Sequence, residues 1–272
     1  RSHLNIAHEC IDRHPPDKTA LRIQFADGKR EIYTFGELSR LTSKFAHALE
    51  KLGVAKGDRV CVVLDPRLEY YVAVFGALKR GAIVVPCFTG FGKDGLIFRL
   101  KDSEASILVT TDDKVEMVKG DYFGRVITVG EEFNRVIKDE AESYACRETC
   151  SGNDVAVYQY SSGTSRQYPE AVKHYHKSVP VSLPAVLLQM GMRKEDRFFC
   201  PSSPAWGHGL WYGTFAPLVV GTAAGTYSGK FDERVLLEAL QEFKINAIAA
   251  APTVFRQIKT SDFQPLDFVF AR

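Results

Sequence analysis

Short apolar runs and amphipathic helical segments alternate along this chain, and this alternation limits the folds open to it. Residues 60–64 form an unbroken apolar run of the kind found in strands that are buried on both faces. A helical segment at 68–79 follows, and further apolar runs lie at 83–85, 106–110 and 125–129. Apolar strands separated by helices are typical of parallel sheets with crossover helices. We therefore expect a parallel sheet in the first half of the chain.

The second half repeats this alternation. Apolar runs that read as strands lie at 155–160, 171–173, 197–200, 223–227, 245–250 and 267–270. Helical segments separate them at 178–190, 209–219 and 231–243, and Pro184 should kink the first of these. A second sheet is therefore expected. The predicted fold class is α/β, with two packed sheets and flanking helices.

The N-terminal region carries its own local signals. An amphipathic helix should end at the prolines that follow Asp12, and residues 21–25 and 31–34 read as a hairpin with a glycine in its turn. Thr34 is followed three residues later by Glu37, the spacing of a capping box. A helix should start there and end near Gly53, with its leucines on one face.

Composition excludes several partners. The 272 residues are 45% hydrophobic and 25% charged, with a formal net charge of +2, which gives no electrostatic basis for binding nucleic acid. No apolar run approaches the ~20 residues of a membrane span, and the N-terminus is not a secretory signal. Cys146 and Cys150 have no second pair to complete a zinc site, so we expect no metal site and a reduced, cytoplasmic protein. His174 and His176 also lack nearby partners, so one should be packed and the other exposed.

A hydroxyl-rich loop follows the apolar run at 155–160. Its sequence, SSGTSRQYPE at 161–170, places four serine and threonine residues and an arginine around Gly163. Glycine lets the backbone turn tightly, and hydroxyls with successive backbone N–H groups can surround a phosphate. The loop is not a P-loop, because it lacks both the spacing and the lysine of that motif. An ordinary surface loop is the alternative, since such residues are common in turns.

The loop resembles the T-S-G-T-T-G-x-P-K-G-V signature of the adenylate-forming (AMP-binding) superfamily, and other stretches agree in order. IYTFGEL at 32–38 is similar to the family's Y-T-[YF]-x-E-L, and ALKRGAIVVP at 77–86 to its L-x-x-G-A-x-x-V-P. PAWGHG at 204–209, with APLVVG at 216–221, resembles the D-x-x-W-x-x-G-H and P-L-x-x-G of acetyl- and medium-chain acyl-CoA synthetases. The four matches cover nearly the whole chain.

This resemblance implies an acid–thiol ligase that uses ATP, Mg²⁺ and coenzyme A with a small carboxylic acid. It implies that the β- and γ-phosphates of ATP are held by the loop residues Ser161, Ser162, Gly163, Thr164, Ser165 and Arg166. It further implies that Trp206, His208 and Gly209 line the acyl and coenzyme A pocket. By the same resemblance, residues 58–192 form the α/β subdomain that carries the loop, and residues 1–57 with 193–272 form a second, incomplete one.

The resemblance is to the N-terminal portion of the family only. The Y-G-x-T-E segment, the ribose-binding aspartate and the C-terminal lobe with its catalytic lysine would all follow Arg272. We therefore expect no catalytic residue within the chain and no activity from the chain alone. The edges that the missing C-terminal portion would cover favour a homodimer or aggregation.

Two other functions remain open at this point. Gly90, Gly92 and Gly95 spell G-x-G-x-x-G, with Asp112 and Asp113 roughly 20 residues on, as in a dinucleotide fingerprint of an NAD-dependent oxidoreductase. Against this, four residues separate the preceding apolar run from the first glycine. The chain could also be a short, non-catalytic relative that acts as a binding module.

The loop departs from the family pattern at two positions, and this predicts which of its charged residues contacts phosphate. Arg166 stands where glycine is usual, and Glu170 occupies the lysine position. Since a carboxylate repels polyphosphate and arginine binds phosphate well, Arg166→Ala should weaken ATP use by the complete protein by ~1.5–3 kcal/mol. Glu170→Ala should do little or help. Steady-state kinetics in ATP check this, and a crippling Glu170→Ala would contradict it.

Overall fold

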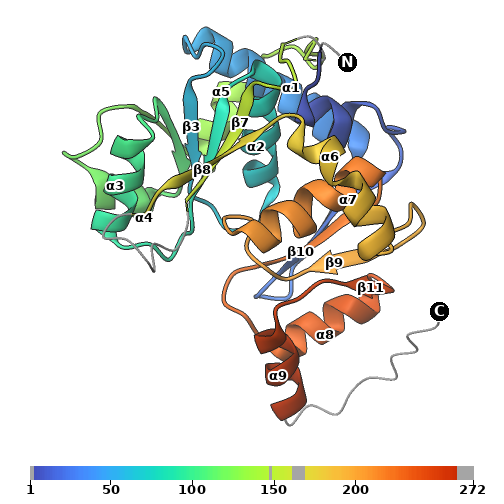
Figure 1. Cartoon of the computed structure of the whole chain (residues 1–272). Helices are drawn as coiled ribbons and strands as arrows, with labels where there is room; N and C mark the ends of the chain where they lie inside the picture. Colours follow the sequence, from blue (N-terminus) through green and yellow to red (C-terminus); the bar gives the residue numbers. More distant parts are fainter. Residues whose placement is uncertain (1–2, 147–148, 161–168, 262–272) are drawn as a thin grey trace.

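The computed structural model describes residues 3–146, 149–160 and 169–261, which form two mixed sheets with helices around them (Figure 1). The six-stranded sheet has the order β6-β5-β3-β4-β7-β8, in which only β7 and β8 pair antiparallel. Its strands are β3 (Arg59–Val62), β4 (Ile83–Pro86), β5 (Ile107–Thr110), β6 (Arg125–Thr128), β7 (Val155–Tyr160) and β8 (Ala171–Tyr175).

The five-stranded sheet joins the two ends of the described chain. Its order is β11-β9-β10-β1-β2, and Leu21 of β1 pairs in parallel with Ala224 of β10. Among the described strands of this sheet, only β1 and β2 pair antiparallel, as a hairpin. The strands are β1 (Thr19–Phe25), β2 (Arg30–Thr34), β9 (Phe198–Cys200), β10 (Ala224–Ser228) and β11 (Ala247–Ile248).

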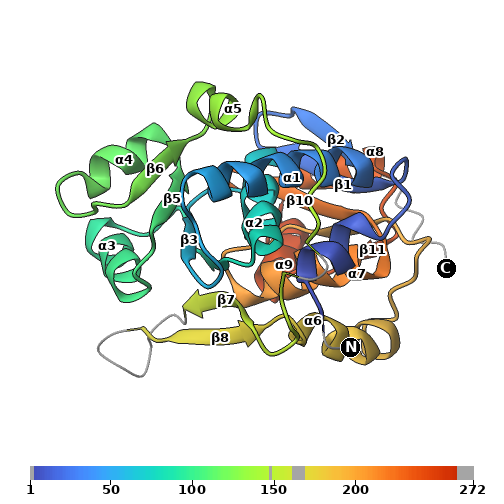
Figure 2. The same ribbon diagram turned by 90° about the horizontal axis from the view of Figure 1, so that it is seen from above.

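Two helices lie between the sheets and connect them (Figure 2). Helix α1 contacts β1 and β2, helix α2 contacts β3 and β4, and the two helices pack against each other. The α-helices are α1 (Phe35–Lys51), α2 (Leu68–Arg80), α3 (Lys93–Asp102), α4 (Asp112–Val118), α5 (Glu131–Ile137), α6 (Ser178–Pro184), α7 (Ala216–Val220), α8 (Glu233–Glu242) and α9 (Pro252–Thr260). Wider π-helical segments are η1 (His8–Asp12), η2 (Ala185–Gln189) and η3 (His208–Phe215).

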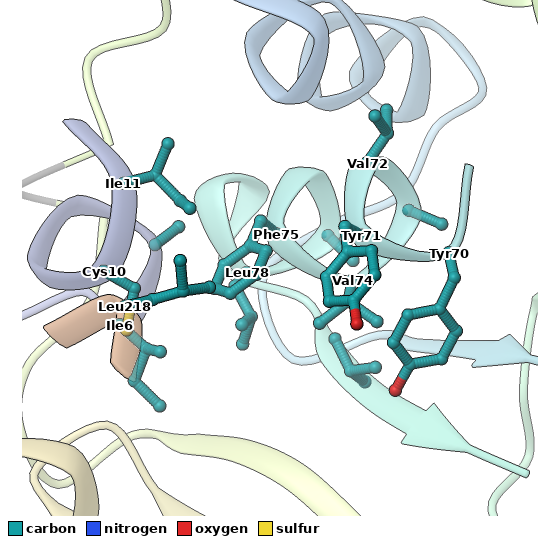
Figure 3. Close-up of a cluster of buried hydrophobic side chains, with 14 of the residues drawn as sticks. Ile6, Cys10, Ile11, Tyr70, Tyr71, Val72, Val74, Phe75, Leu78 and Leu218 are labelled. Atoms are coloured by element: carbon teal, nitrogen blue, oxygen red, sulfur yellow. The ribbon is translucent and has the colours of Figure 1, made fainter. Parts of the chain in front are cut away.

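Helix α2 is the centre of the hydrophobic core. Every residue from Tyr70 to Lys79 is buried, because side chains on all faces of the helix meet other elements. Figure 3 shows its side chains beside those of the N-terminal segment and α7. Gly76 lets α2 pack closely against α1. A Cβ at this position would lie only 2.8 Å from the Phe45 ring and 2.9 Å from the Thr42 carbonyl oxygen, both in α1.

The last turn of α2 holds a buried ammonium group. Lys79 is 1% exposed, and its Nζ lies 2.6 Å from Asp12 Oδ1, 2.9 Å from Ser43 Oγ and 3.1 Å from the Ser39 carbonyl oxygen. A buried charge is tolerated only when it is paired and hydrogen-bonded. Asp12 also accepts hydrogen bonds from Ser39 Oγ and Cys146 Sγ. This network ties the N-terminal segment to α1 and α2.

Of the two histidines at 174 and 176, one was expected to be packed and the other exposed, and only the packed one is found as expected. His176 is fully buried, and its Nδ1 accepts a hydrogen bond from the Ile6 backbone N–H at 3.0 Å. Burial lowers the pKa of His176 to about 4. His174 is half-buried rather than exposed, because its ring packs against Trp211 with centroids 4.7 Å apart.

Most expected elements are confirmed, with some corrections. The capping box forms, since Thr34 Oγ1 accepts from the Glu37 N–H and Glu37 Oε2 from the Thr34 N–H. The parallel sheet expected in the first half of the chain is confirmed by β3 to β6, and the strand expected at 171–173 is β8, which runs antiparallel to β7. Helix α4 was not expected, and the helix that should kink at Pro184 changes there to the wider η2.

Two expectations about the fold are not tested by the described residues. The strand expected at 267–270 lies outside the described residues, and the division into subdomains at 58–192 stays a prediction. The six cysteines are free thiols, all of them buried. Among the described residues no helix has the length and hydrophobicity to cross a membrane.

The Lys79 network predicts an asymmetric response to mutation. Asp12→Ala leaves an uncompensated buried ammonium group and should lower the free energy of unfolding by about 3–5 kcal/mol. Lys119→Ala, which removes an exposed partner of Glu116, should cause no measurable change. Urea unfolding followed by circular dichroism measures both. Equal stabilities for the two variants would contradict the role assigned to the network.

His176 predicts a pH-dependent loss of stability. Its folded-state pKa of about 4 lies below the ordinary value of 6.5, so the unfolded state binds the proton first as pH falls. The contribution of His176 is complete above pH 6.5 and disappears as pH falls to about 4, a loss of up to about 3 kcal/mol. In His176→Gln the unfolding free energy should fall less over this window. Identical slopes in urea melts of both proteins would refute the assignment.

Candidate functional site

The carboxyl ends of strands from both sheets meet around one region. Strand β7 ends at Tyr160, and the segment after β9 carries Pro204 to Gly207 toward it. A Cβ at Gly207 would lie 3.7 Å from the side chain of Gln159 in β7. In α/β proteins, ligands bind outside the carboxyl ends of parallel strands. This junction is therefore the candidate site.

The hydroxyl-rich loop connects β7 to β8 at this junction. Ser161, Ser162, Gly163, Thr164, Ser165 and Arg166 lie outside the described residues, so their phosphate contacts stay a prediction. The flanks are described: Tyr160 pairs with Ala171, and Glu170 is exposed. Lys173 on β8 lies over the Tyr158 ring, 5.4 Å from its centroid.

Trp206 belongs to an aromatic cluster that joins the two sheets. Its ring centroid lies 5.6 Å from that of Phe88 and 5.7 Å from that of Phe91, both in the segment after β4. The Arg99 guanidinium lies over the Phe91 ring at 3.8 Å. The Tyr70 hydroxyl donates to the Pro204 carbonyl oxygen at 3.3 Å, which ties this segment to α2. Trp206 is thus held rigidly between segments that follow strands.

His208 and Gly209 start η3, and they lie in different surroundings. His208 is exposed, with Nδ1 3.0 Å from Ser202 Oγ and its ring 5.5 Å from that of Tyr212. Gly209 is buried, and a Cβ there would lie 2.1 Å from the Ser203 carbonyl oxygen. Gly209 is therefore required by close backbone packing. Its part in a ligand pocket stays a prediction.

A pocket of about 470 Å³ opens beside these residues, between β8, α6, η2 and η3. Its lining consists of His174, Ser178, Ser182, Ala185, Val186, Gly207, Trp211, Tyr212 and Ala216. None of these side chains is a carboxylate, lysine or arginine, and burial lowers the pKa of His174, which keeps its imidazole neutral at pH 7. The volume is in the range of small-molecule sites. The pocket suits an uncharged, largely apolar group.

Sequence reasoning missed three residues of this pocket region. Gln159 is a polar residue in an otherwise apolar strand, which was the available signal. Trp211 lies one helical turn beyond the predicted Trp206 to Gly209 stretch, and His174 was interpreted as structural. Their meeting depends on the register between β7 and β8 and on the path of η3, which the sequence pattern does not specify.

The G-x-G-x-x-G stretch does not form a dinucleotide turn. Gly92 precedes α3 with open space where a Cβ would lie, and Gly95 is inside the helix. Asp112 and Asp113 begin α4 instead of ending a strand. Gly92 and Gly95 therefore lack the close approaches that this fingerprint requires, and the close neighbour of Gly90 is the ring of Phe88.

One group of metal-ligating side chains exists among the described residues. His8, Asp12 and Cys146 place one ligand atom each within 4.8 Å of one another. They do not fit a nucleotide-bound magnesium, which prefers oxygen ligands. Lys79 already pairs with Asp12, at the opposite end of α2 from Tyr70 and the candidate site.

Comparison with known proteins agrees with this geometry. A family model described as "AMP-binding enzyme" matches residues 8–269. Acetyl-coenzyme A synthetase of Bacillus subtilis (strain 168) is 31% identical over 270 residues, which are 94% of this chain and 47% of that protein. The mitochondrial acyl-coenzyme A synthetase ACSM3 of Homo sapiens is 25% identical over 257 residues, 89% of this chain and 44% of that protein.

Solved structures share the fold. The acyl-CoA synthetase of Brucella canis superposes with a TM-score of 0.87 at 24% identity, over 95% of this chain and 49% of that one. ATP-bound MatB from Rhodopseudomonas palustris superposes with a TM-score of 0.82 at 19% identity, over 95% of this chain and 51% of that one. The chain thus spans about half the length of the proteins it matches. With its two mixed sheets and a family match over residues 8–269, the chain belongs to the AMP-binding enzyme family.

Proposed function

We propose that this chain is the N-terminal part of an ATP-dependent acyl-CoA synthetase. The observation that carries the proposal is the junction of the two sheets, where β7, the strand that leads into the loop, ends near a pocket of about 470 Å³ without charged lining residues. An anion-binding loop beside an uncharged pocket suits a reaction between polyphosphate and the carboxyl end of an apolar acid. The similarity to acetyl- and acyl-coenzyme A synthetases supports the same reaction class.

The proposed reaction has two displacements. A carboxylate oxygen of the acid bonds to the α-phosphorus of ATP as the bond to pyrophosphate breaks. The thiolate sulfur of coenzyme A then bonds to the acyl carbon, and AMP leaves with the electron pair of the broken C–O bond. Mg²⁺ would supply charge screening on the phosphates, through ligands in the portion of the family that this chain does not cover.

The residues of this chain act in that reaction by positioning. Ser161 to Arg166 would hold the β- and γ-phosphates, as donors fixed before the reaction starts. Trp206, held between Phe88 and Phe91, would form a rigid wall of the acyl and coenzyme A pocket, with His208 and Gly209 beside it. We place the protein in the cytoplasm, with residues 58–192 as the subdomain that carries the loop.

The second candidate function is that of a binding module without catalysis, which the same pocket of about 470 Å³ would serve. In that case the pocket and the loop would bind a ligand without converting it to a product. Exposed apolar side chains such as Val181 and Leu188, at 72% and 84% exposure, would favour self-association of such a chain.

The two candidates differ in carboxylate-dependent exchange of pyrophosphate into ATP. The full reading frame containing this chain should exchange, and the 272 residues alone should not, because positioning groups act together and the loss of one commonly costs orders of magnitude. Absence of exchange by the full frame with any acid of two to eight carbons would favour the binding module. Robust exchange by the 272 residues would place catalytic groups within them.

A further inference from the structure

The side chain of Gln159 has a donor that nothing in the described structure uses. Gln159 is 9% exposed, and the Trp211 indole Nε1–H donates to its Oε1 at 3.2 Å. An indole N–H can only donate, so this contact fixes which end of the carboxamide is oxygen. The Nε2 group is then buried with no hydrogen-bond partner among the described residues. An amide donor left in this state lowers stability, and such groups are rare in folded proteins.

The carboxamide faces the pocket through Gly207. A Cβ on Gly207 would lie 3.7 Å from both Nε2 and Oε1 of Gln159, so no side chain of residue 207 covers the amide. Gly207 and Trp211 both line the pocket of about 470 Å³. Gln159 also stands at the carboxyl end of β7, one residue before the strand ends at Tyr160. The free donor therefore lies directly behind Gly207 and Trp211 in the pocket wall, where a ligand can approach it only past Gly207, which has no side chain.

The remaining polar groups of the pocket limit what the donor can meet. Ser182 Oγ donates to the Val179 carbonyl oxygen at 2.7 Å, and Ser178 Oγ accepts from the Tyr175 N–H at 3.2 Å. His174 is neutral and no lining residue is charged. A ligand group with a negative charge would therefore find no positive charge in the pocket to offset its burial. A neutral oxygen on an apolar chain matches both the donor and the walls.

We propose that Gln159 Nε2 selects a ligand with an uncharged oxygen acceptor, a hydroxyl or carbonyl, on a flexible apolar chain. The inference rests on the proposed function, which supplies two ligands of this chemistry. One is the tail of a hydroxy- or oxo-substituted carboxylic acid, and the other is the pantetheine arm of coenzyme A with its amide carbonyls. Gln159 is then a specificity-determining residue, and Trp211 is the positioning residue that orients it.

Calorimetric titration of the whole chain tests this without requiring turnover. The matched probes are 6-hydroxyhexanoate and heptanoate, which differ by a hydroxyl in place of a methyl, and D-pantetheine is the third. The hydroxy acid should bind about tenfold more tightly than heptanoate, the effect of one buried hydrogen bond. Gln159→Met, which keeps the length but not the amide, should abolish that preference. Gln159→Glu keeps an oxygen that accepts from Trp211 but has no N–H donor, so this variant should also lose the preference for the hydroxy acid.

Gln24→Met is the control. Gln24 is fully buried in β1 and bonds to the Phe25 carbonyl oxygen and Arg30, so the same substitution there should leave the preference intact. Loss of pantetheine affinity alone in Gln159→Met would identify coenzyme A as the source of the acceptor. Equal binding of all probes to wild type and Gln159→Met, or no binding to wild type, overturns the proposal. Failure of pyrophosphate exchange by the full frame would contradict only the proposed reaction.

Discussion

The burial of α2 on all sides is the constraint on which both sheets depend. Each large apolar side chain removed from water stabilises the fold by about 1.5–3 kcal/mol, and α2 contributes such side chains to one core shared by strands of both sheets. Its two ends have different partners. Tyr70 in the first turn contacts the segment that carries Trp206, and Lys79 in the last turn is held by Asp12. A shift of this helix would therefore move the candidate site and the N-terminal segment together.

The proposed site would combine two electrostatic environments. The sequence of the loop after β7 is rich in donors and includes Arg166, which suits the multiple negative charges of polyphosphate. The pocket has no charged lining residue, so under the proposed function it would take the apolar chain of an acid rather than its carboxylate. Gln159 lies one residue before β7 ends and behind the wall of this pocket. An amide there adds hydrogen-bond selectivity without adding a charge that would need compensation.

Much of the fold followed from periodicity, because strands and helices that are buried on one or all faces leave a clear apolar pattern. The capping box at Thr34 and the strands from Arg59 to Tyr160 were predictable in this way. Helix α4 was missed because it is short and only Val118 is buried. The pocket was missed for another reason: Gln159, His174 and Trp211 come together only through tertiary packing. The resemblance indicated the family and Trp206, and the comparisons confirm the family.

The order of the strands in the five-stranded sheet has a consequence for biosynthesis. Strand β1 leaves the ribosome before its parallel partner β10, which lies about two hundred residues later, with Leu21 opposite Ala224. At ~5–20 residues per second, roughly 10–40 s separate the two. During this interval the six-stranded sheet can assemble, since its last strand ends at Tyr175. The open edge of β1 would meanwhile be available to other chains. The hairpin of β1 and β2 thus has an unpaired strand edge for longer than any strand pair of the six-stranded sheet during synthesis.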